Sequence, residues 1–402
     1  MLEVILIIIF SLIVHLACYF YISRKEKNYF NIFFLFIFNV LPVSFVLEPL
    51  YIYYNGLFGS VYSYVFIYLS YAFNILAIVI GYRFIPDKLI LKLPFSRIKS
   101  KSLIWGTIFI VAGFLVYLPV LIEFKEYIFQ PREIYVRTRT GYGIFFFVSS
   151  SLSIIGFIII LFSRNVTVKI VLIAFVTVSL FLYLHGSKGQ VVTIFIITAL
   201  YYVYIKDWKI GIKKIALIST TASLLILGLF YLTTSYEYDN IFQILIGYSD
   251  YNRNAMLVID NKNQNLYYGQ LTYESNFYSR IPRILMPNKP KEYGGFRLAK
   301  QYFPDWFYAE TGDPAFGIGV AYADFSDFAI IYELFFALLT GALVKIFINR
   351  LKLYKSPGDF IVVLFLSNIS LISIGAAWLL PEHLFLAFFV NMILAIKVKV
   401  RG

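Results

Sequence analysis

Residues 2–22 read LEVILIIIFSLIVHLACYFYI, an apolar run in which Glu3 is the only Asp, Glu, Lys or Arg. About 20 apolar residues in a helix cross the hydrocarbon core of a bilayer. Runs of similar length and character recur along the chain, and they predict eleven membrane spans. The predicted spans are 2–22, 31–53, 58–82, 103–122, 144–163, 166–184, 190–205, 215–234, 328–348, 360–380 and 384–397.

The composition leads to the same fold class. The 402-residue chain is 60% hydrophobic, 20% aromatic and 14% charged, whereas a soluble domain is about 45–50% apolar and about 25% charged. The chain therefore has too few polar side chains to cover a soluble particle. The long apolar runs also exclude a porin-type barrel, whose strands are short and alternate in polarity. We expect an all-α polytopic integral membrane protein with about 11 transmembrane helices.

Cysteine content, the N-terminus and net charge add three smaller expectations. Cys18 is the single cysteine, which excludes an intrachain disulfide and a thiolate metal cluster. The opening residues MLEV lack the basic region of a secretory signal, so the first span is predicted to be retained. The net charge of +13 is expected to reflect membrane orientation and not nucleic-acid binding.

Lysine and arginine predict the orientation of the spans. With the N-terminus outside, 22 of the 35 basic residues fall in inner segments. The other 13 are outer, and eight of them lie in one long loop, which the positive-inside rule discounts. We therefore expect a multi-pass protein of the cell (inner) membrane, with its N-terminus outside and its C-terminus cytoplasmic.

This orientation divides the chain into three parts. Residues 1–234 are predicted to form a bundle of about eight spans with an outer loop at 123–143, and residues 328–402 a bundle of about three spans. Between them lies a large periplasmic or extracellular loop, residues 235–327. Its mixed charge and its many aromatic residues are not those of a disordered tail. Long loops of this kind are usually functional.

The chain contains none of the common nucleotide or protease signatures, such as a P-loop or His-Glu-x-x-His. Its conspicuous residues are cations on the predicted outer face. The stretch QPREIYVRTRTGYG, residues 130–143, contains Arg132, Arg137 and Arg139. The fork of donors on arginine matches phosphate oxygens, so these residues are expected to bind a pyrophosphate at the membrane surface. Contact with lipid headgroups is the alternative.

Two further cationic stretches follow. The turn HGSKGQ, residues 185–190, offers Lys188 and backbone N–H groups to an anion, or is simply a turn at the membrane surface. The stretch YSRIPRILMPNKPKEYGG, residues 278–295, contains Arg280, Arg283 and Lys289 among prolines that disfavour a continuous helix. Aromatic rings can cover the apolar faces of sugars, and the candidates for this role are Tyr278 and Trp306.

Two ionisable positions fall within or beside spans. Glu333 lies in the predicted ninth span, and Glu382 and His383 lie at the outer end of the tenth. A carboxylate inside a membrane is costly and is a functional candidate by default. The alternative for Glu333 is protonation or pairing with a buried arginine.

The long loop resembles that of the Wzy-type O-antigen and oligosaccharide repeat-unit polymerases. RIPRILMPNKP (280–290), then TGDPAFGIGVAYADFS (311–326) and a returning span, are similar to the family's proline- and lysine-bearing stretch and its aromatic entry into a span. HGSKG (185–189) resembles its Ser-Arg-Gly turn, with Lys188 replacing the arginine. The family's pattern of Arg, ten residues and Gly occurs once in each large outer loop, as Arg132 with Gly143 and as Arg283 with Gly294.

This resemblance implies a GT-C-like membrane glycosyltransferase that makes O-antigen, capsule or exopolysaccharide. Such a polymerase transfers a growing glycan from undecaprenyl pyrophosphate onto a lipid-linked repeat unit at the outer face of the membrane. It implies no cofactor and no metal, with membrane lipid and the pathway's flippase and chain-length regulator as partners. Arginines would stabilise the charge that develops on the pyrophosphate leaving group.

The catalytic candidates are Arg280, Arg283, Glu310 and His383. An acceptor hydroxyl also needs a general base, for which the candidates are His383, Glu382, Glu310, Asp313 and Asp324. Two other functions remain open. A flippase for lipid-linked oligosaccharides is expected to have related halves and more intramembrane charge. An O-antigen ligase-type transferase would differ from a polymerase only in its acceptor.

Overall fold

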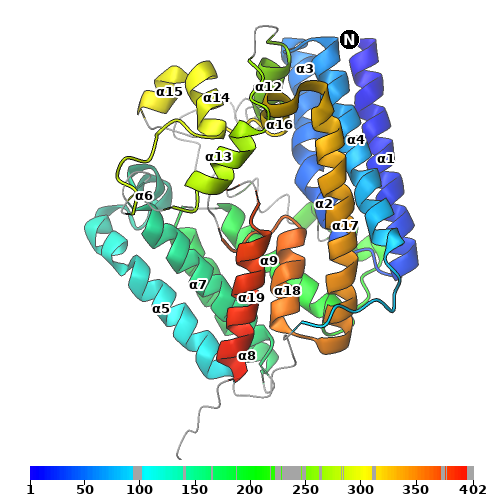
Figure 1. Cartoon of the computed structure of the whole chain (residues 1–402). Helices are drawn as coiled ribbons and strands as arrows, with labels where there is room; N and C mark the ends of the chain where they lie inside the picture. The colour runs from blue at the N-terminus through cyan, green and yellow to red at the C-terminus, as the bar shows by residue number, and fades with distance from the viewer. Residues whose placement is uncertain are drawn as a thin grey trace, which may run out of the picture.

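The computed structural model describes residues 1–93, 102–138, 142–163, 166–186, 188–217, 219–221, 228, 246, 250–261, 265–281, 283, 285–309, 314–372, 376 and 378–395, without the side chain of Lys188. All regular elements in these ranges are helices (Figure 1).

Six helical stretches of the described chain are long and apolar enough to cross a membrane. Four of them are single helices: α1 (Leu2–Glu26), α4 (Val61–Phe84), α5 (Ser102–Glu123) and α7 (Gly143–Leu161). The fifth consists of the consecutive elements α2 (Ile32–Val40), η1 (Leu41–Leu47) and α3 (Glu48–Asn55). The sixth consists of α16 (Ile318–Phe325), η3 (Ser326–Phe328) and α17 (Ala329–Tyr354). Four shorter apolar helices are α8 (Val168–Leu184), α9 (Lys188–Tyr204), α18 (Pro357–Leu366) and α19 (Leu380–Ala395). The protein is therefore a multi-pass helical membrane protein.

The helices pack in pairs that are formed from distant parts of the sequence. α4 packs against α17 and α1, α5 against α7, and α18 against α19. Between α4 and α17, a Cβ atom on Gly81 would lie 2.1 Å from the Leu338 carbonyl oxygen, and one on Gly341 would lie 2.0 Å from that of Ile78. Small residues at such crossings allow membrane helices to approach closely. The two glycines thus hold α17 against the N-terminal bundle.

One predicted span is wrong in its bounds. The apolar run at 360–380 does not form one helix, because α18 ends at Leu366 and Asn368 adopts a left-handed φ of 63°. The Ser367 hydroxyl bonds back to the Val363 carbonyl at 2.7 Å, and the next helix, α19, begins at Leu380. α18 is about 15 Å long, half the thickness of the hydrocarbon core. The described residues between these helices are therefore non-helical at membrane depth.

The predicted eighth span, 215–234, lies mostly outside the described residues. The two large loops that the sequence predicts to be outer contain short helices where they are described. These are α6 (Pro131–Arg137) in the first loop, and α12 (Asp250–Ile259), α13 (Gln270–Tyr278), α14 (Gly295–Tyr302) and α15 (Pro304–Ala309) in the second. A short 3₁₀ turn, η2 (Lys125–Tyr127), precedes α6.

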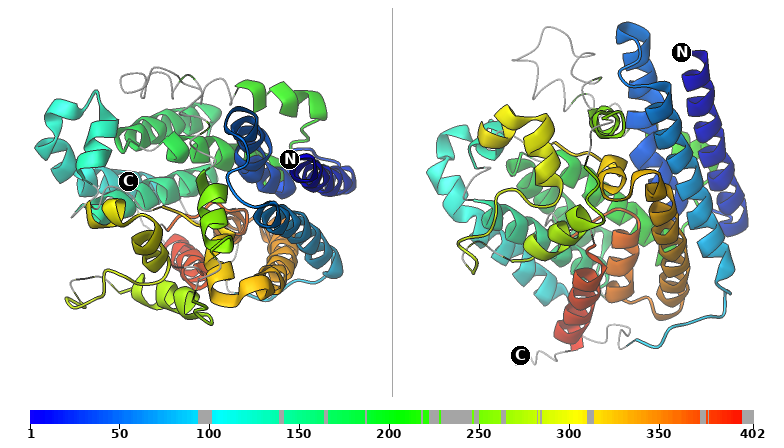
Figure 2. Two further views of the ribbon diagram at one scale, coloured as in Figure 1. Left: turned by 90° about the horizontal axis from the view of Figure 1, so that it is seen from above. Right: turned by 45° about the horizontal axis from the view of Figure 1, so that its top comes forward.

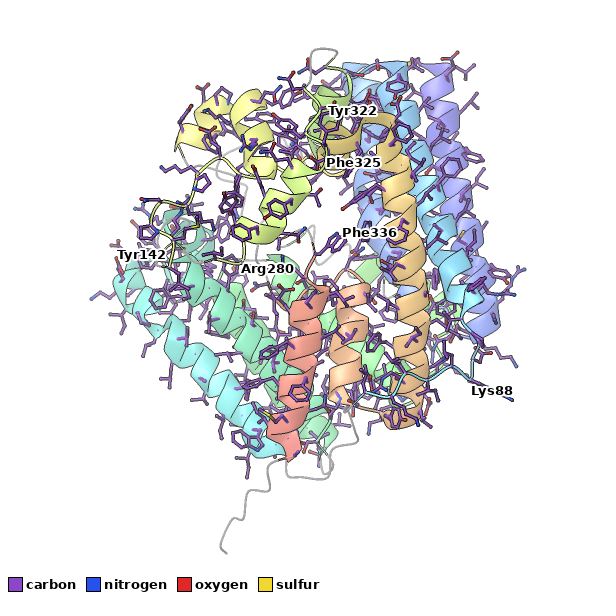
Figure 3. All side chains as sticks on the ribbon, in the orientation of Figure 1. Lys88, Tyr142, Arg280, Tyr322, Phe325 and Phe336 are labelled. Atoms are coloured by element: carbon purple, nitrogen blue, oxygen red, sulfur yellow. The ribbon has the colours of Figure 1, made fainter. Side chains whose placement is uncertain are left out.

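The helices of the second loop lie at one end of the molecule, the end at which α1 begins (Figures 1 and 2). The opposite end contains Lys88 (Figure 3). Asp324 fixes α13 in this position, since its carboxylate accepts from the backbone N–H groups of Leu271 and Thr272, both at 2.9 Å. Asp324, one of the general-base candidates, thus caps the N-terminus of α13 with both of its carboxylate oxygens.

Candidate functional site

A cavity of about 1090 Å³ lies between α13, α14, α17 and the residues that lead into α19. Its lining follows α17 from Tyr332 to Leu343, a distance of about 16 Å along the helix axis. The cavity therefore begins beside the outer-loop helices and descends into the membrane bundle. Phe336 lines the cavity, and Figure 3 labels it together with Arg280, which lies nearby.

The lining changes in character with depth. Thr272, Ser275 and Tyr293 line the end formed by the loop helices, whereas Leu339 and Leu343 line the part deeper along α17. The non-helical segment between α18 and α19 contributes Asn368 and Trp378. Irregular backbone at membrane depth is tolerated where it lines a cavity. The broken helix thus supplies polar groups to a cavity that is otherwise largely apolar, as is usual for binding sites.

Arg280 ties α13 to the start of α19. Its guanidinium forms an ion pair with Glu382 and donates to the Trp378 carbonyl, while Nη1 also donates to the Asn276 carbonyl at 2.5 Å. The Asn276 side chain in turn accepts from the Trp378 backbone N–H at 2.9 Å. Because Trp378 lines the cavity, Arg280 holds part of the cavity wall in place.

Arg283 and Lys289 lie on the loop that joins α13 to α14. Arg283 donates to the Lys289 carbonyl at 2.9 Å, and Lys289 donates to the Ile281 carbonyl at 3.1 Å. The Lys289 ammonium lies 4.9 Å from the centre of the Tyr293 ring, which lines the cavity. The Tyr278 ring is 5.4 Å from the same ring. The structure therefore places Lys289 and Tyr278 beside Tyr293 at one rim of the cavity, with Arg283 bonded to the same loop.

Gly294 is required where this loop enters α14. Its φ is +54°, and a Cβ atom there would lie 2.0 Å from the Ser275 hydroxyl oxygen. Its backbone N–H donates to Glu274 at 2.9 Å, and Arg297 also binds that carboxylate through two bonds of 2.8 Å. Burial opposes ionisation of Glu274, but these partners outweigh it and lower its pKa. The ion pair and the glycine together close the loop onto α13.

His383 is fully buried beside the cavity. Its Nε2 accepts from the Leu371 backbone N–H at 3.1 Å, so the proton lies on Nδ1, which donates to the Leu379 carbonyl at 2.7 Å. The ring stacks on Phe365 at 4.1 Å. Both ring nitrogens thus bind backbone, and His383 holds the segment between α18 and α19.

The first of the two large loops, residues 123–143, carries cations that are separate from those of the loop between α13 and α14. Arg132 lies 5.0 Å from the Tyr135 ring, and Arg137 lies 4.4 Å from the Tyr127 ring and 3.6 Å from the Glu133 carboxylate. Seen from above, α6 lies apart from the loop between α13 and α14 (Figure 2). The structure therefore does not bring Arg132 and Arg137 to the rim that Arg280 occupies.

The described residues His185 and Gly186 of the stretch 185–190 lie close to α6. Gly186 has a φ of +66°, and a Cβ atom there would lie 2.4 Å from the Pro131 carbonyl oxygen. His185 is buried, stacks on Tyr117 at 3.9 Å and lies 2.7 Å from the Ser149 hydroxyl. Two of the predicted cationic stretches, one before α7 and one before α9, thus meet at one place.

The remaining candidates are dispersed. Trp306, in α15, is half exposed and stacks on Phe303 at 5.7 Å, away from the cavity lining. Arg139, Glu310 and Asp313 lie outside the described residues, as does the Lys188 side chain. Sequence reasoning missed Asn276 and Trp378. The spacing of four between Asn276 and Arg280 could have pointed to the first, but the contact of Trp378 with α13 has no local signal.

These elements define a class of protein: a multi-pass membrane protein whose cavity joins a large, cation-bearing loop to the interior of the bundle. Comparison with known sequences gives the family. The chain is 36% identical over 368 residues to the O-antigen polymerase of Salmonella typhimurium strain LT2 and, equally, to that of Salmonella typhi. Each alignment covers 91% of this chain and 89% of the Salmonella protein.

The chain therefore belongs to the O-antigen polymerase family, as the resemblance of its loop motifs predicted. No family model matches it, and no solved structure matches it.

Proposed function

We propose that this protein is a polysaccharide polymerase with a GT-C-like body, which transfers a growing glycan from undecaprenyl pyrophosphate onto a lipid-linked repeat unit. The cavity carries this proposal. Its rim bears Arg280, Arg283 and Lys289, and its lining continues about 16 Å along α17 among apolar side chains. A substrate with a charged head and a long apolar tail matches such a site.

The chemistry follows from the substrate. An acceptor hydroxyl attacks the anomeric carbon of the donor sugar, and the bond from that carbon to the pyrophosphate oxygen breaks. Negative charge then develops on the leaving group, and preorganised cations stabilise it. Arg283 and Lys289 are the proposed ligands of this charge. Arg280 and His383 hold the wall around it, and Glu310 remains a proposed catalytic residue.

The other predicted residues have supporting roles. Arg132, Arg137, Arg139 and Lys188 are proposed to contact the pyrophosphate or glycan of the lipid-linked substrates, and Tyr278 and Trp306 to contact sugar faces. The end of the molecule that carries the outer loops is proposed to face the periplasm or cell exterior. The excess of basic residues in the opposite segments supports this orientation. Both substrates are anchored in the same membrane plane, which favours their encounter.

A reconstituted assay tests the proposal. Purified protein in liposomes is expected to lengthen a defined undecaprenyl-pyrophosphate-linked repeat unit without ATP, nucleotide sugar or divalent metal, and EDTA is expected to leave the rate unchanged. Loss of extension in EDTA that magnesium restores would contradict the metal-free mechanism. Failure to extend the substrate, combined with its transport across the membrane, would identify a flippase instead.

A further inference from the structure

We propose that Glu333 is the general base that accepts the proton of the acceptor hydroxyl, an inference that rests on the proposed function. Glu333 lines the cavity, and among the described lining residues it is the one with a carboxylate. It is the fifth residue of α17, about 6 Å along the axis from the outer end of that helix. Its carboxylate therefore lies near the end of α17 that adjoins the loop helices.

The other described carboxylates near the cavity are engaged elsewhere. Glu382 is paired with Arg280, and Asp324 caps α13. His383, the remaining described candidate, uses both ring nitrogens for backbone bonds and is fully buried. In contrast, no hydrogen bond or ion pair joins Glu333 to another residue in the part of the chain that the structure describes. Its oxygens are thus available to a ligand in the cavity.

A carboxylate at position 333 costs free energy of folding in a membrane helix, so its presence indicates a function. An ionisable side chain in a membrane helix is unfavourable, and such residues usually pair with one another or face a cavity. Glu333 faces the cavity. The titratable groups around it are Tyr71 from α4, Tyr332 from its own helix and, across the cavity, the pair of Arg280 and Glu382. None of these holds its carboxylate in an ion pair.

The reaction balances with this assignment. The acceptor oxygen forms a bond to the donor anomeric carbon as its proton passes to a Glu333 oxygen. The bond from the anomeric carbon to pyrophosphate breaks, and undecaprenyl pyrophosphate leaves with the electron pair. The proton then returns to solvent or to the leaving group. No oxidant, reductant or further reactant is required.

Substitutions of Glu333 in the full-length protein test the assignment. Glu333→Gln keeps the shape and removes the base, so turnover on a defined lipid-linked repeat unit is expected to fall about 100-fold or more. The apparent KM should change little, and the acidic limb of the pH–rate profile should disappear. Glu333→Asp keeps a carboxylate and should retain measurable turnover with that limb. Glu292→Gln makes the same chemical change in the half-exposed ion pair with Lys300, outside the cavity, and should leave turnover unchanged.

Two results would overturn the assignment. One is turnover of Glu333→Gln within about threefold of the unmodified protein, because a general base contributes far more than this. The other is an equal loss in the Gln and Asp variants together with a lowered unfolding temperature, which would make Glu333 a structural residue. If the unmodified protein itself does not extend the substrate, the proposed function fails. If it does and Glu333→Gln does also, the base assignment alone fails.

Discussion

Arg283 and Lys289, at the rim of the cavity, carry the same charge but present different hydrogen-bond donors to a ligand. Arg283 reaches the Lys289 carbonyl through one nitrogen of its guanidinium and is exposed. Arginine presents a planar fork of donors, whereas lysine presents a point charge. Arg283 and Lys289 are therefore not equivalent. In the proposed mechanism Arg283 holds both the loop and a pyrophosphate, whereas Lys289 is held over Tyr293.

Arg283→Lys is expected to impair polymerisation nearly as much as Arg283→Ala, because both lose the bidentate fork. The measurement is glycan chain length at matched expression. Arg83→Lys is the control, since Arg83 stacks on Tyr21 at the opposite end of the molecule, and it should give chains of normal length. Normal chains from Arg283→Ala would exclude Arg283 as a pyrophosphate ligand.

At the scale of elements, the cavity depends on the hydrogen bonds and ion pairs that join the short loop helices to neighbouring helices. Asp324 caps α13 from α16, Arg280 ties α13 to α19, and Glu274 joins α13 to α14 through Arg297. Each of these interactions is a hydrogen bond with a charged partner, which is stronger than a hydrogen bond between neutral groups. These bonds, and not the propensity of helices of six to ten residues, hold the loop helices in place.

The Glu274 bond predicts a dependence of stability on pH. The pKa of Glu274 is lowered in the folded protein, so its contribution is complete above its ordinary value of 4.5 and is lost as pH falls through the lowered value. At pH 7, Glu274→Gln is expected to cost about 1.5–3 kcal/mol, because a charged hydrogen-bond partner is removed.

Thermal unfolding in detergent checks this, with Glu292→Gln as the exposed counterpart. The control should cost no more than about 1 kcal/mol. The deficit of Glu274→Gln should shrink in acid, as pH falls below the ordinary value of 4.5 and through the lowered pKa. A deficit that stays constant with pH would mean that packing, and not charge, is responsible for the effect of Glu274.

At the scale of the whole molecule, two ends with different chemistry are separated by the bundle. One end carries α12 to α15 and the cavity, and the other carries Lys88 and the basic ends of several helices (Figure 3). α17 connects the ends, and its close contact with α4 fixes the N-terminal bundle beside the cavity. This arrangement agrees with the proposal that the reaction occurs at one membrane face.

Labelling of cysteines tests this orientation. In a Cys18→Ala background, Tyr268→Cys should react with an impermeant thiol reagent in intact cells, because Tyr268 is 81% exposed on the outer-loop end. Lys88→Cys, exposed at the opposite end, should react only after the membrane is opened. The reverse pattern would place the cavity on the cytoplasmic side and contradict the proposed donor.

The sequence by itself determined the helical membrane fold, because a run of about 20 apolar residues has few alternatives in a bilayer. It also identified the stretch 278–295, since arginines and prolines in an outer loop are conspicuous without any contact information. Only the tertiary structure showed that α18 ends at Leu366, because the backbone of the segment after it is held by side chains from other helices, as in the bond from the Leu371 N–H to His383. Ser151, for example, bonds to the Leu371 carbonyl at 2.6 Å.

The cavity likewise depends on tertiary structure alone. Its walls come from residues in the ranges 272–296, 314–321, 332–343, 365–368 and 378–381, and no local pattern records which of them meet. The same holds for the carboxylates. Sequence spacing could not separate Glu382 and Asp324, which are bound to partners about 100 and 50 residues away, from Glu333, which faces the cavity. Local periodicity determines a helix, whereas a site is decided by side chains that only packing brings together.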